Sequence, residues 1–263
     1  MLDPELVYSA FSGIPKGFRR AMLTEYLQCK ILGYIYGSVL SKGLVSIGGT
    51  ALRIFYGTRR FSEDLDFDSI DVSFQRFTEL MDTVGKEFEL EGVECEVSAK
   101  RPGAFMGTVR FTGILQEWEL TARGDEVLRL KIDAGSQNYS YSPEIRILNR
   151  FDITATIPVA PDSLVLAQKL NAILERSRVM ARDLYDSVYL FGRTEPDMRY
   201  LLQKQGTDNR RELANRINRK LSQRDIQRLA SDLAPFLPDR KEVQKVKLFP
   251  EILRNWVEAD IAT

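Results

Sequence analysis

The stretch that decides the fold of this chain is Gly48-Gly49-Thr50-Ala51-Leu52, followed by Arg60-Phe61-Ser62-Glu63-Asp64-Leu65-Asp66-Phe67. An apolar run at 44–47 leads into the glycine pair, so the pattern predicts a strand, a tight turn, a helix and then a second strand. Side chains two residues apart on a strand lie on the same face. Asp64 and Asp66 are therefore expected to project together, while Leu65 and Phe67 enter a core.

Two carboxylates this close repel each other, so a site that holds both usually also holds cations. The best candidate for a third carboxylate is Asp133, at the end of the strand-like run 127–133. If that run lies beside the strand with Asp64 and Asp66, the three side chains converge and predict two Mg²⁺ ions about 3.5–4 Å apart, with Mn²⁺ as the other candidate metal. The alternative is that Asp133, which precedes Ala134-Gly135, only begins a turn.

The glycine pair is the second half of the predicted site. A Gly-Gly turn that opens a helix presents backbone N–H groups, which favour phosphate binding, although any tight turn can use such a pair. The ordered set is more specific than its parts: a strand, the turn, a helix, Asp-x-Asp on a strand and a later strand ending in Asp. This order predicts metal-dependent nucleotidyl transfer.

Composition excludes several classes of chemistry. The 263 residues include no histidine, which excludes histidine-dependent triads and histidine zinc sites. Cys29 and Cys95 have no spacing typical of zinc or a disulfide framework, so we expect both to be reduced. No apolar run approaches about 20 residues, and the N-terminus lacks the features of a signal peptide. We therefore expect a cytoplasmic protein with no membrane partner.

Strand and helix signals alternate up to about residue 157, and helices alone follow. The expected strands are at 44–47, 64–68, 93–98, 104–111, 127–132 and 145–148. The expected helices are at 16–41, 49–57, 72–91, 162–178, 181–192, 196–204, 209–222, 223–233 and 239–257. Two prolines in Ile157-Pro158-Val159-Ala160-Pro161 predict an extended connector. The fold class is therefore α/β (α+β): a mixed sheet flanked by helices over 1–157, then a helical domain over 158–263.

Charge is unevenly distributed, although the chain as a whole has no net charge. Residues 1–160 carry 18 Lys and Arg against 22 Asp and Glu, whereas residues 161–263 carry 19 against 15. The segment 199–228 concentrates nine basic residues: Arg199, Lys204, Arg210, Arg211, Arg216, Arg219, Lys220, Arg224 and Arg228. Such a run is typical of an RNA-binding surface, and the alternative is a solvated helix face.

Gly48–Leu52, Tyr56-Gly57 and Arg60–Phe67 resemble the signature of the AbiEii/AbiGii toxin family of nucleotidyltransferases, in the DNA polymerase beta-like superfamily. The resemblance continues to about residue 190, through Lys131-Ile132-Asp133, Gln168-Lys169-Leu170-Asn171-Ala172 and Arg182-Asp183-Leu184-Tyr185-Asp186. Fourteen residues separate Gly49 from Asp64, slightly more than is usual in the superfamily. The resemblance implies a nucleotidyltransferase-type sheet and a third carboxylate at Asp133.

The resemblance and the chemistry together give each residue an expected role. Asp64, Asp66 and Asp133 would be catalytic and hold the metal, and Lys169 would be catalytic and contact the triphosphate. The other expected nucleotide-binding residues are Gly48, Gly49 and Thr50 through backbone N–H groups, Ser62 through its hydroxyl, Arg60 and Asp183. Arg60 would neutralise phosphate charge or be only a surface charge. Asp183 would orient Lys169 or hold the sugar or base, and helix-surface ion pairing is the alternative for both.

The resulting hypothesis is an Mg²⁺-dependent enzyme that moves a nucleotide from an NTP to an acceptor. The resemblance implies the toxin of a type IV toxin–antitoxin pair, active in abortive infection, with RNA, including the 3′ end of tRNA, as acceptor and a cognate antitoxin as partner. One alternative is transfer to a protein or a small molecule. Another is a non-catalytic nucleotide-binding protein with the same fold.

Overall fold

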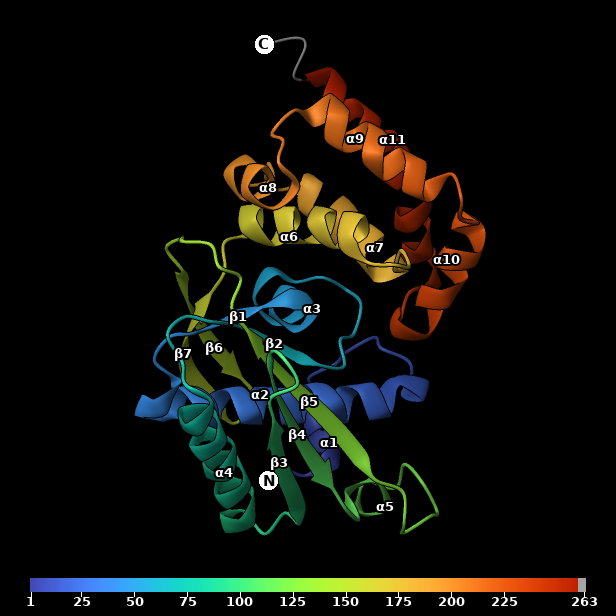
Figure 1. The fold of residues 1–263 in the computed structure, drawn as a ribbon. Coiled ribbons are helices and arrows are strands. Elements are labelled where there is room, and N and C mark those ends of the chain that lie inside the picture. The colour runs from blue at the N-terminus through green and yellow to red at the C-terminus, as the bar shows by residue number, and fades with distance from the viewer. Residues whose placement is uncertain (260–263) are drawn as a thin grey trace. The chain divides into compact units, whose positions relative to one another are not determined.

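The computed structural model describes residues 1–259, which fall into two compact units. Met1–Gly57 and Phe61–Val159 form the first, which we call the sheet unit. Thr58–Arg60 and Ala160–Thr263 form the second, the helical unit. The fold is α/β: a mixed sheet with flanking helices in the first unit and helices in the second, as the sequence predicts (Figure 1).

One seven-stranded sheet organises the first unit, in the order β3-β4-β5-β2-β1-β7-β6. The pairs β2–β5 and β1–β7 are parallel, and the remaining neighbours are antiparallel. The strands are β1 (Leu44–Ile47), β2 (Leu65–Ser69), β3 (Cys95–Lys100), β4 (Phe105–Phe111), β5 (Leu128–Gly135), β6 (Glu144–Arg150) and β7 (Ile153–Val159).

Six of these strands correspond to the predicted ones, and β1 has the predicted bounds. The extended connector predicted at 157–161 is wrong in its first half, because Ile157, Pro158 and Val159 complete β7. Antiparallel pairing with β6 runs along the whole of β7, whereas β1 pairs with it only at Ser46 and Val159. Most of β7 therefore has a ladder on one side, where a residue without an N–H is tolerated.

Helices of the sheet unit position the carboxylate strand from its apolar side. Tyr36 of α2 packs on Phe67 of β2, so the long helix α2 lies over the face that Leu65 and Phe67 enter, each 1% exposed (Figure 1). The short helix α3 contacts β2 next to the glycine pair. The α-helices and the π-helical turn η3 of this unit are α1 (Pro4–Ser9), α2 (Arg19–Gly37), α3 (Gly48–Ala51), η3 (Leu52–Tyr56), α4 (Phe74–Leu90) and α5 (Ile114–Glu117).

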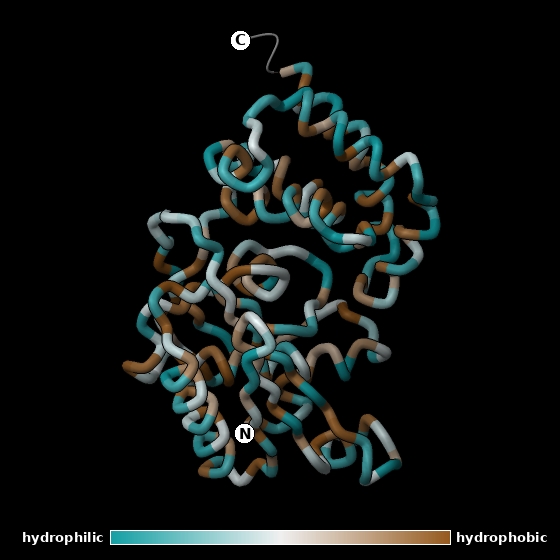
Figure 2. The backbone as a smooth tube through the Cα atoms, in the orientation of Figure 1, coloured by the Kyte–Doolittle hydropathy of each residue, from teal (hydrophilic) through white to brown (hydrophobic). Residues whose placement is uncertain are grey.

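The helical unit packs around apolar faces of amphipathic helices. Its fully buried side chains include Leu184, Leu201, Phe249 and Leu253. Figure 2 shows that α9 is mostly hydrophilic along its length. Among residues 1–259, no helix has the length and apolar character needed to cross a membrane. The helices are α6 (Asp162–Glu175), α7 (Ala181–Phe191), α8 (Met198–Gln205), α9 (Arg210–Leu221), α10 (Ile226–Leu233) and α11 (Gln244–Ala259).

Candidate active site

The three carboxylates can converge only if the strand with Asp133 lies beside β2. That strand is β5, and it is one of the two neighbours of β2. The two strands are parallel, with Asp66 opposite Asp133, so these side chains share one face of the sheet. Asp64 precedes β2 by one residue, and all three side chains are half-buried. Asp133 lies inside β5, which continues to Gly135, so it does not begin a turn.

The electrostatics of Asp133 are those of a carboxylate without a counter-charge. Its Oδ1 atom is buried and makes no hydrogen bond. Burial and the negative charge of Asp64 raise the pKa of Asp133 above its usual value, against a smaller opposing effect of Lys131. A bound cation would relieve both the repulsion and the unpaired oxygen.

The carboxylates suit Mg²⁺ or Mn²⁺ in chemistry, since hard cations prefer oxygen ligands. The register on β2 and β5 and the unpaired Asp133 oxygen agree with that fit. Within residues 1–259, however, no three acidic or cysteine side chains stand close enough to ligate one ion together. The residues present therefore fit a metal by donor type and strand register.

Gly48 is the residue through which the turn approaches the carboxylates. Its φ angle of 76° lies in the left-handed region, and a Cβ placed there would come within 2.2 Å of the Asp66 Oδ2 atom. Only glycine fits both conditions. The next two residues, Gly49 and Thr50, are buried, and the Thr50 hydroxyl donates a hydrogen bond to the Asp64 carbonyl oxygen. The Thr50 side chain thus positions the carboxylate strand and leaves only its backbone N–H for phosphate binding.

Ser62 lies in the segment that leads into β2, with its side chain half-exposed. Its carbonyl oxygen accepts a hydrogen bond from Gln28 Nε2 of α2 at 3.0 Å. The backbone is therefore held by the long helix, two residues before Asp64.

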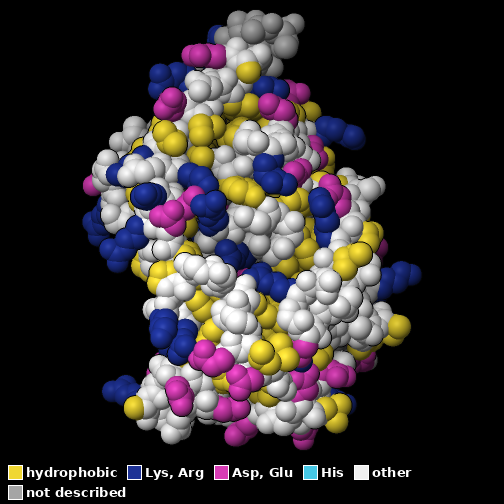
Figure 3. Space-filling model, turned by 180° about the vertical axis from the view of Figure 1, so that it is seen from behind, with side chains coloured by type: hydrophobic (Ala, Val, Ile, Leu, Met, Phe, Trp, Pro, Cys, Tyr) yellow, Lys and Arg dark blue, Asp and Glu magenta, His cyan; other side chains and the backbone are white. Residues whose placement is uncertain are grey.

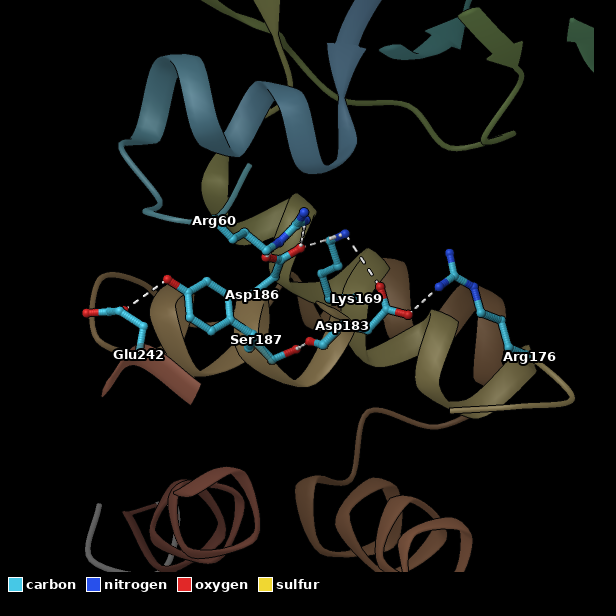
Figure 4. A network of polar contacts seen from close by, with 8 residues as sticks. Arg60, Lys169, Arg176, Asp183, Asp186, Ser187 and Glu242 are labelled. Atoms are coloured by element: carbon cyan, nitrogen blue, oxygen red, sulfur yellow. Dashed lines mark hydrogen bonds and ion pairs between the residues drawn. The ribbon is translucent and has the colours of Figure 1, made fainter. Parts of the chain in front are cut away.

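A second cluster of charged residues lies inside the helical unit (Figure 4). Arg60 is 4% exposed and donates two hydrogen bonds to the fully buried Asp186, Nε to Oδ1 and a terminal nitrogen to Oδ2, each at 2.6 Å. The Lys169 ammonium lies 2.9 Å from Asp186 Oδ2 and 3.5 Å from Asp183 Oδ1. Arg176 forms an ion pair with Asp183. We call these five residues the buried ion network.

The buried ion network excludes the surface alternatives left open for its members, and their roles in nucleotide binding stay predictions. Arg60 is not a surface charge, and Lys169 and Asp183 do not form a surface ion pair, because the three side chains are at most 11% exposed. Burial alone would raise the pKa of Asp186, but Arg60 and Lys169 outweigh it and hold this pKa below its usual range. Three cations therefore contact two carboxylates, and Arg176, at 41% exposed, is the one among them that also faces solvent.

Sequence reasoning missed Asp186 as a site residue. The available signal was its spacing: Asp183 and Asp186 are three residues apart on α7, so they share a helix face, and both are buried. The surroundings of α7 were not predicted either. Tyr185 donates a hydrogen bond to Glu242 at 3.0 Å, and the Ser187 hydroxyl donates one to the Asp183 carbonyl oxygen at 2.7 Å.

Comparison with known proteins places this chain in a family. The sequence profile described as "Nucleotidyl transferase AbiEii toxin, Type IV TA system" matches residues 37–255. The chain belongs to this family. It is therefore a nucleotidyltransferase. The family consists of toxins from type IV toxin–antitoxin systems, and membership implies a nucleotide substrate and a cognate antitoxin.

Solved structures show the same fold. The crystal structure of JHP933 from Helicobacter pylori is 20% identical, covers 95% of this chain and 97% of its own, and has a TM-score of 0.56. A candidate nucleotidyltransferase from H. pylori is 21% identical, covers 91% and 97%, and also has a TM-score of 0.56. A search of curated protein sequences gives no significant match.

In this member of the AbiEii family, the basic run at 199–228 is the candidate acceptor surface. Its basic residues fall into two groups, one that contacts neighbouring helices and one that is exposed. Some join helices to one another: Arg216 donates to the Gln205 carbonyl oxygen at 3.0 Å, and Lys220 to that of Arg176 at 2.8 Å. Others are exposed, namely Arg199, Arg211, Arg219, Arg224 and Arg228. On the face seen in Figure 3, Lys and Arg side chains gather on the helical unit.

One face of α9 combines two of these arginines with neutral polar residues. Arg211, Asn215, Asn218, Arg219 and Ser222 follow helical spacing, and all five are exposed. The last four line a shallow hollow of about 530 Å³. Arginine and asparagine are the side chains that most often contact phosphates and base edges. We call these five residues the α9 polar face.

Proposed function

We propose that this chain transfers a nucleotidyl group from an NTP to an RNA acceptor with Mg²⁺, and that this reaction underlies its action as a toxin. The observation that carries the proposal is the alignment of Asp66, two residues after Asp64, with Asp133 on parallel strands. Asp133 also has a buried oxygen that makes no hydrogen bond. An acceptor hydroxyl oxygen forms the new bond to the α-phosphorus, the bond to pyrophosphate breaks, and the hydroxyl proton is released.

Asp64, Asp66 and Asp133 would hold the metal. Bound there, Mg²⁺ supplies charge neutralisation for the triphosphate and makes an attacking hydroxyl more acidic. The chain itself contributes the framework: β2 and β5 fix the carboxylates, and the Thr50 hydroxyl fixes the backbone at Asp64.

The triphosphate would be bound by the backbone N–H groups of Gly48, Gly49 and Thr50 and by the Ser62 hydroxyl. The absence of a side chain at Gly48 supports this role, since the turn comes into contact with the Asp66 carboxylate. Lys169 would supply a positive charge to the phosphates. Its support is the fixed position of the ammonium group, which is 11% exposed and held by Asp183, by Asp186 and, through Asp186, by Arg60.

RNA is favoured as the acceptor by the α9 polar face. Its two arginines, two asparagines and one serine offer many hydrogen-bond donors, and Glu212 is the one exposed acidic residue beside them on α9. Such a face attracts a phosphate backbone and also offers groups for base edges. The tRNA 3′ end is the first acceptor to examine, because it presents a free hydroxyl on a single strand.

The test incubates the purified protein with Mg²⁺, total tRNA and each α-labelled NTP separately, beside Asp64→Ala. Glu63→Ala is the matched control, because Glu63 is the exposed neighbour of Asp64. We expect label in RNA with the wild type and with Glu63→Ala, and a loss of at least about 1,000-fold with Asp64→Ala. Label that survives in Asp64→Ala would contradict the proposed site.

Two other outcomes separate the alternatives. NTP binding without label in RNA would overturn the RNA acceptor and direct the search to protein and small-molecule acceptors. Growth arrest on expression that persists in Asp64→Ala would favour a binding role over catalysis.

A further inference from the structure

A pocket of about 440 Å³ lies on the sheet unit beyond the proposed metal ligands. Its floor is Asp68, the third aspartate in the alternating run Asp64, Asp66, Asp68. Asp68 pairs with Gly135 at the end of β5, and residues 136 and 138–141 of the segment that follows also line the pocket. The proposed function leaves this pocket without a role.

Asp68 carries an unsatisfied buried charge. The residue is 1% exposed, and its Oδ1 atom accepts a hydrogen bond from the Gln137 backbone N–H at 2.8 Å. Its Oδ2 atom is buried and makes no hydrogen bond. Buried carboxylate oxygens are normally paired, because desolvating an unpaired charge costs several kcal/mol. A ligand that donates a hydrogen bond to Oδ2 would remove this cost.

The lining of the pocket defines the charge of that ligand. A second carboxylate, Asp71, lines it together with the hydroxyl and amide groups of Ser136 and Asn138. None of the described residues lining the pocket is Lys or Arg, so a phosphate or another anion would be repelled. The ligand that fits is therefore a cation.

Two aromatic rings distinguish an organic cation from a metal ion. Tyr139 and Tyr141 line the pocket with their rings stacked at 6.3 Å and 19°. Aromatic faces attract ammonium and guanidinium groups. Burial, the negative charge of Asp68 and the approach of the Tyr141 hydroxyl to the Asp68 carboxylate raise the pKa of Tyr141, which keeps this hydroxyl neutral and beside the proposed anion.

We propose that this pocket binds an ammonium or guanidinium group, with Asp68 as its buried anion and Asp71 and the two tyrosine rings around it. The group would come from a small polyamine-like cation or from a basic side chain of a protein. Because Asp68 is two residues from Asp66, the bound cation would lie roughly 7 Å along β2 from the proposed metal ligands. This site goes beyond the proposed transfer reaction.

Isothermal titration calorimetry of the full chain, without NTP, tests the proposal. The probes are spermidine, free arginine and an arginine-containing tripeptide, with Mg²⁺ and inorganic phosphate as comparisons. If only spermidine binds, the ligand is a small cation. If the tripeptide binds more tightly than spermidine, the ligand is a basic side chain of a protein. Because no NTP is present, failure of the transferase assay leaves this result unaffected.

Three variants locate the binding. Asp68→Asn keeps an acceptor for the Gln137 N–H, removes the charge, and is expected to weaken cation binding about tenfold or more. Asp71→Asn, at an exposed position where folding is not at risk, is expected to weaken it about threefold. The matched control is Asp82→Asn, which lines a different hollow with Lys86 and should change nothing.

Several results would overturn the proposal. These are equal binding by the wild type and a folded Asp68→Asn protein, binding of Mg²⁺ or phosphate in place of the organic probes, and no binding of any organic cation.

Discussion

The sheet unit and the helical unit treat buried aspartates in opposite ways. Asp133 lies beside other carboxylates, and burial and the charge of Asp64 raise its pKa. Asp186 is more deeply buried, yet Arg60 and Lys169 hold its pKa below the usual range. The difference is the counter-charge: Arg60 and Lys169 contact Asp186 directly, whereas the opposing effect of Lys131 on Asp133 is smaller than that of burial and of Asp64. A carboxylate that contacts cations of the chain holds other side chains in position. A carboxylate without such contacts is available to bind a ligand.

The largest effect that this comparison predicts is on stability, with Asp186→Asn. The substitution removes the charge that Arg60 and Lys169 share, and we expect a loss of about 3–5 kcal/mol in the free energy of unfolding. Denaturant unfolding measures it. The matched control is Asp232→Asn, which breaks the exposed pair with Arg178 and should cost less than about 1 kcal/mol. Equal losses in the two variants would show that burial of the network does not matter.

The same variant has a pH signature. Because the native pKa of Asp186 is lowered, its contribution to stability is present above the unfolded value, about 3.9, and is lost as the pH falls through the native pKa. The stability difference between wild type and Asp186→Asn should therefore be constant near neutral pH and shrink below about pH 4. A difference that persists in acid would point to lost packing as its cause.

Gly48→Ala probes the other side of the comparison. Alanine would be strained at a φ of 76° and would press on the Asp66 carboxylate, so we expect a loss of about 2–4 kcal/mol, together with reduced transfer activity. The control is Gly13→Ala, where φ is 78° and nothing lies within 4 Å of the added carbon. The difference between the two variants isolates the contact with Asp66. No difference would mean that the turn moves away freely.

How much the sequence predicts depends on how local the information is. The strand, turn and Asp-x-Asp pattern lies within about 25 residues, and its alternation alone places Leu65 and Phe67 in the core. The pairing of β2 with β5 was predicted only conditionally, because strand order is not a local property. The role of Arg60 and Asp186 was missed since the two are 126 residues apart and each, read alone, resembles an ordinary surface charge. Pro158 misled because most of β7 has a ladder on one side only, so a residue without an N–H can continue the strand.

Arg60→Lys tests whether geometry or charge alone holds the buried ion network. Lysine keeps the positive charge but cannot donate the two parallel hydrogen bonds to Asp186, so we expect a loss of about 2 kcal/mol by denaturant unfolding. Arg59→Lys is the control, because Arg59 is 68% exposed and lies 3.4 Å from Glu242. An Arg60→Lys protein as stable as wild type would show that only the charge is needed.

The smallest predicted effect has the opposite sign. Asp133→Asn should stabilise the metal-free protein at neutral pH, by about 2 °C in Tm, because it removes a charge that the native state disfavours. The gain should disappear as the pH falls below the raised native pKa, where wild-type Asp133 is itself protonated and neutral. Added Mg²⁺ should raise the Tm of the wild type and not that of the variant, since ligand binding to the native state stabilises it. Thermal unfolding with and without Mg²⁺, at neutral and acid pH, measures all three. A variant less stable than wild type at neutral pH would mean that compensating contacts stabilise the charged form of Asp133. Asp133 and Asp186 would then differ in their place in the fold and not in their counter-charges.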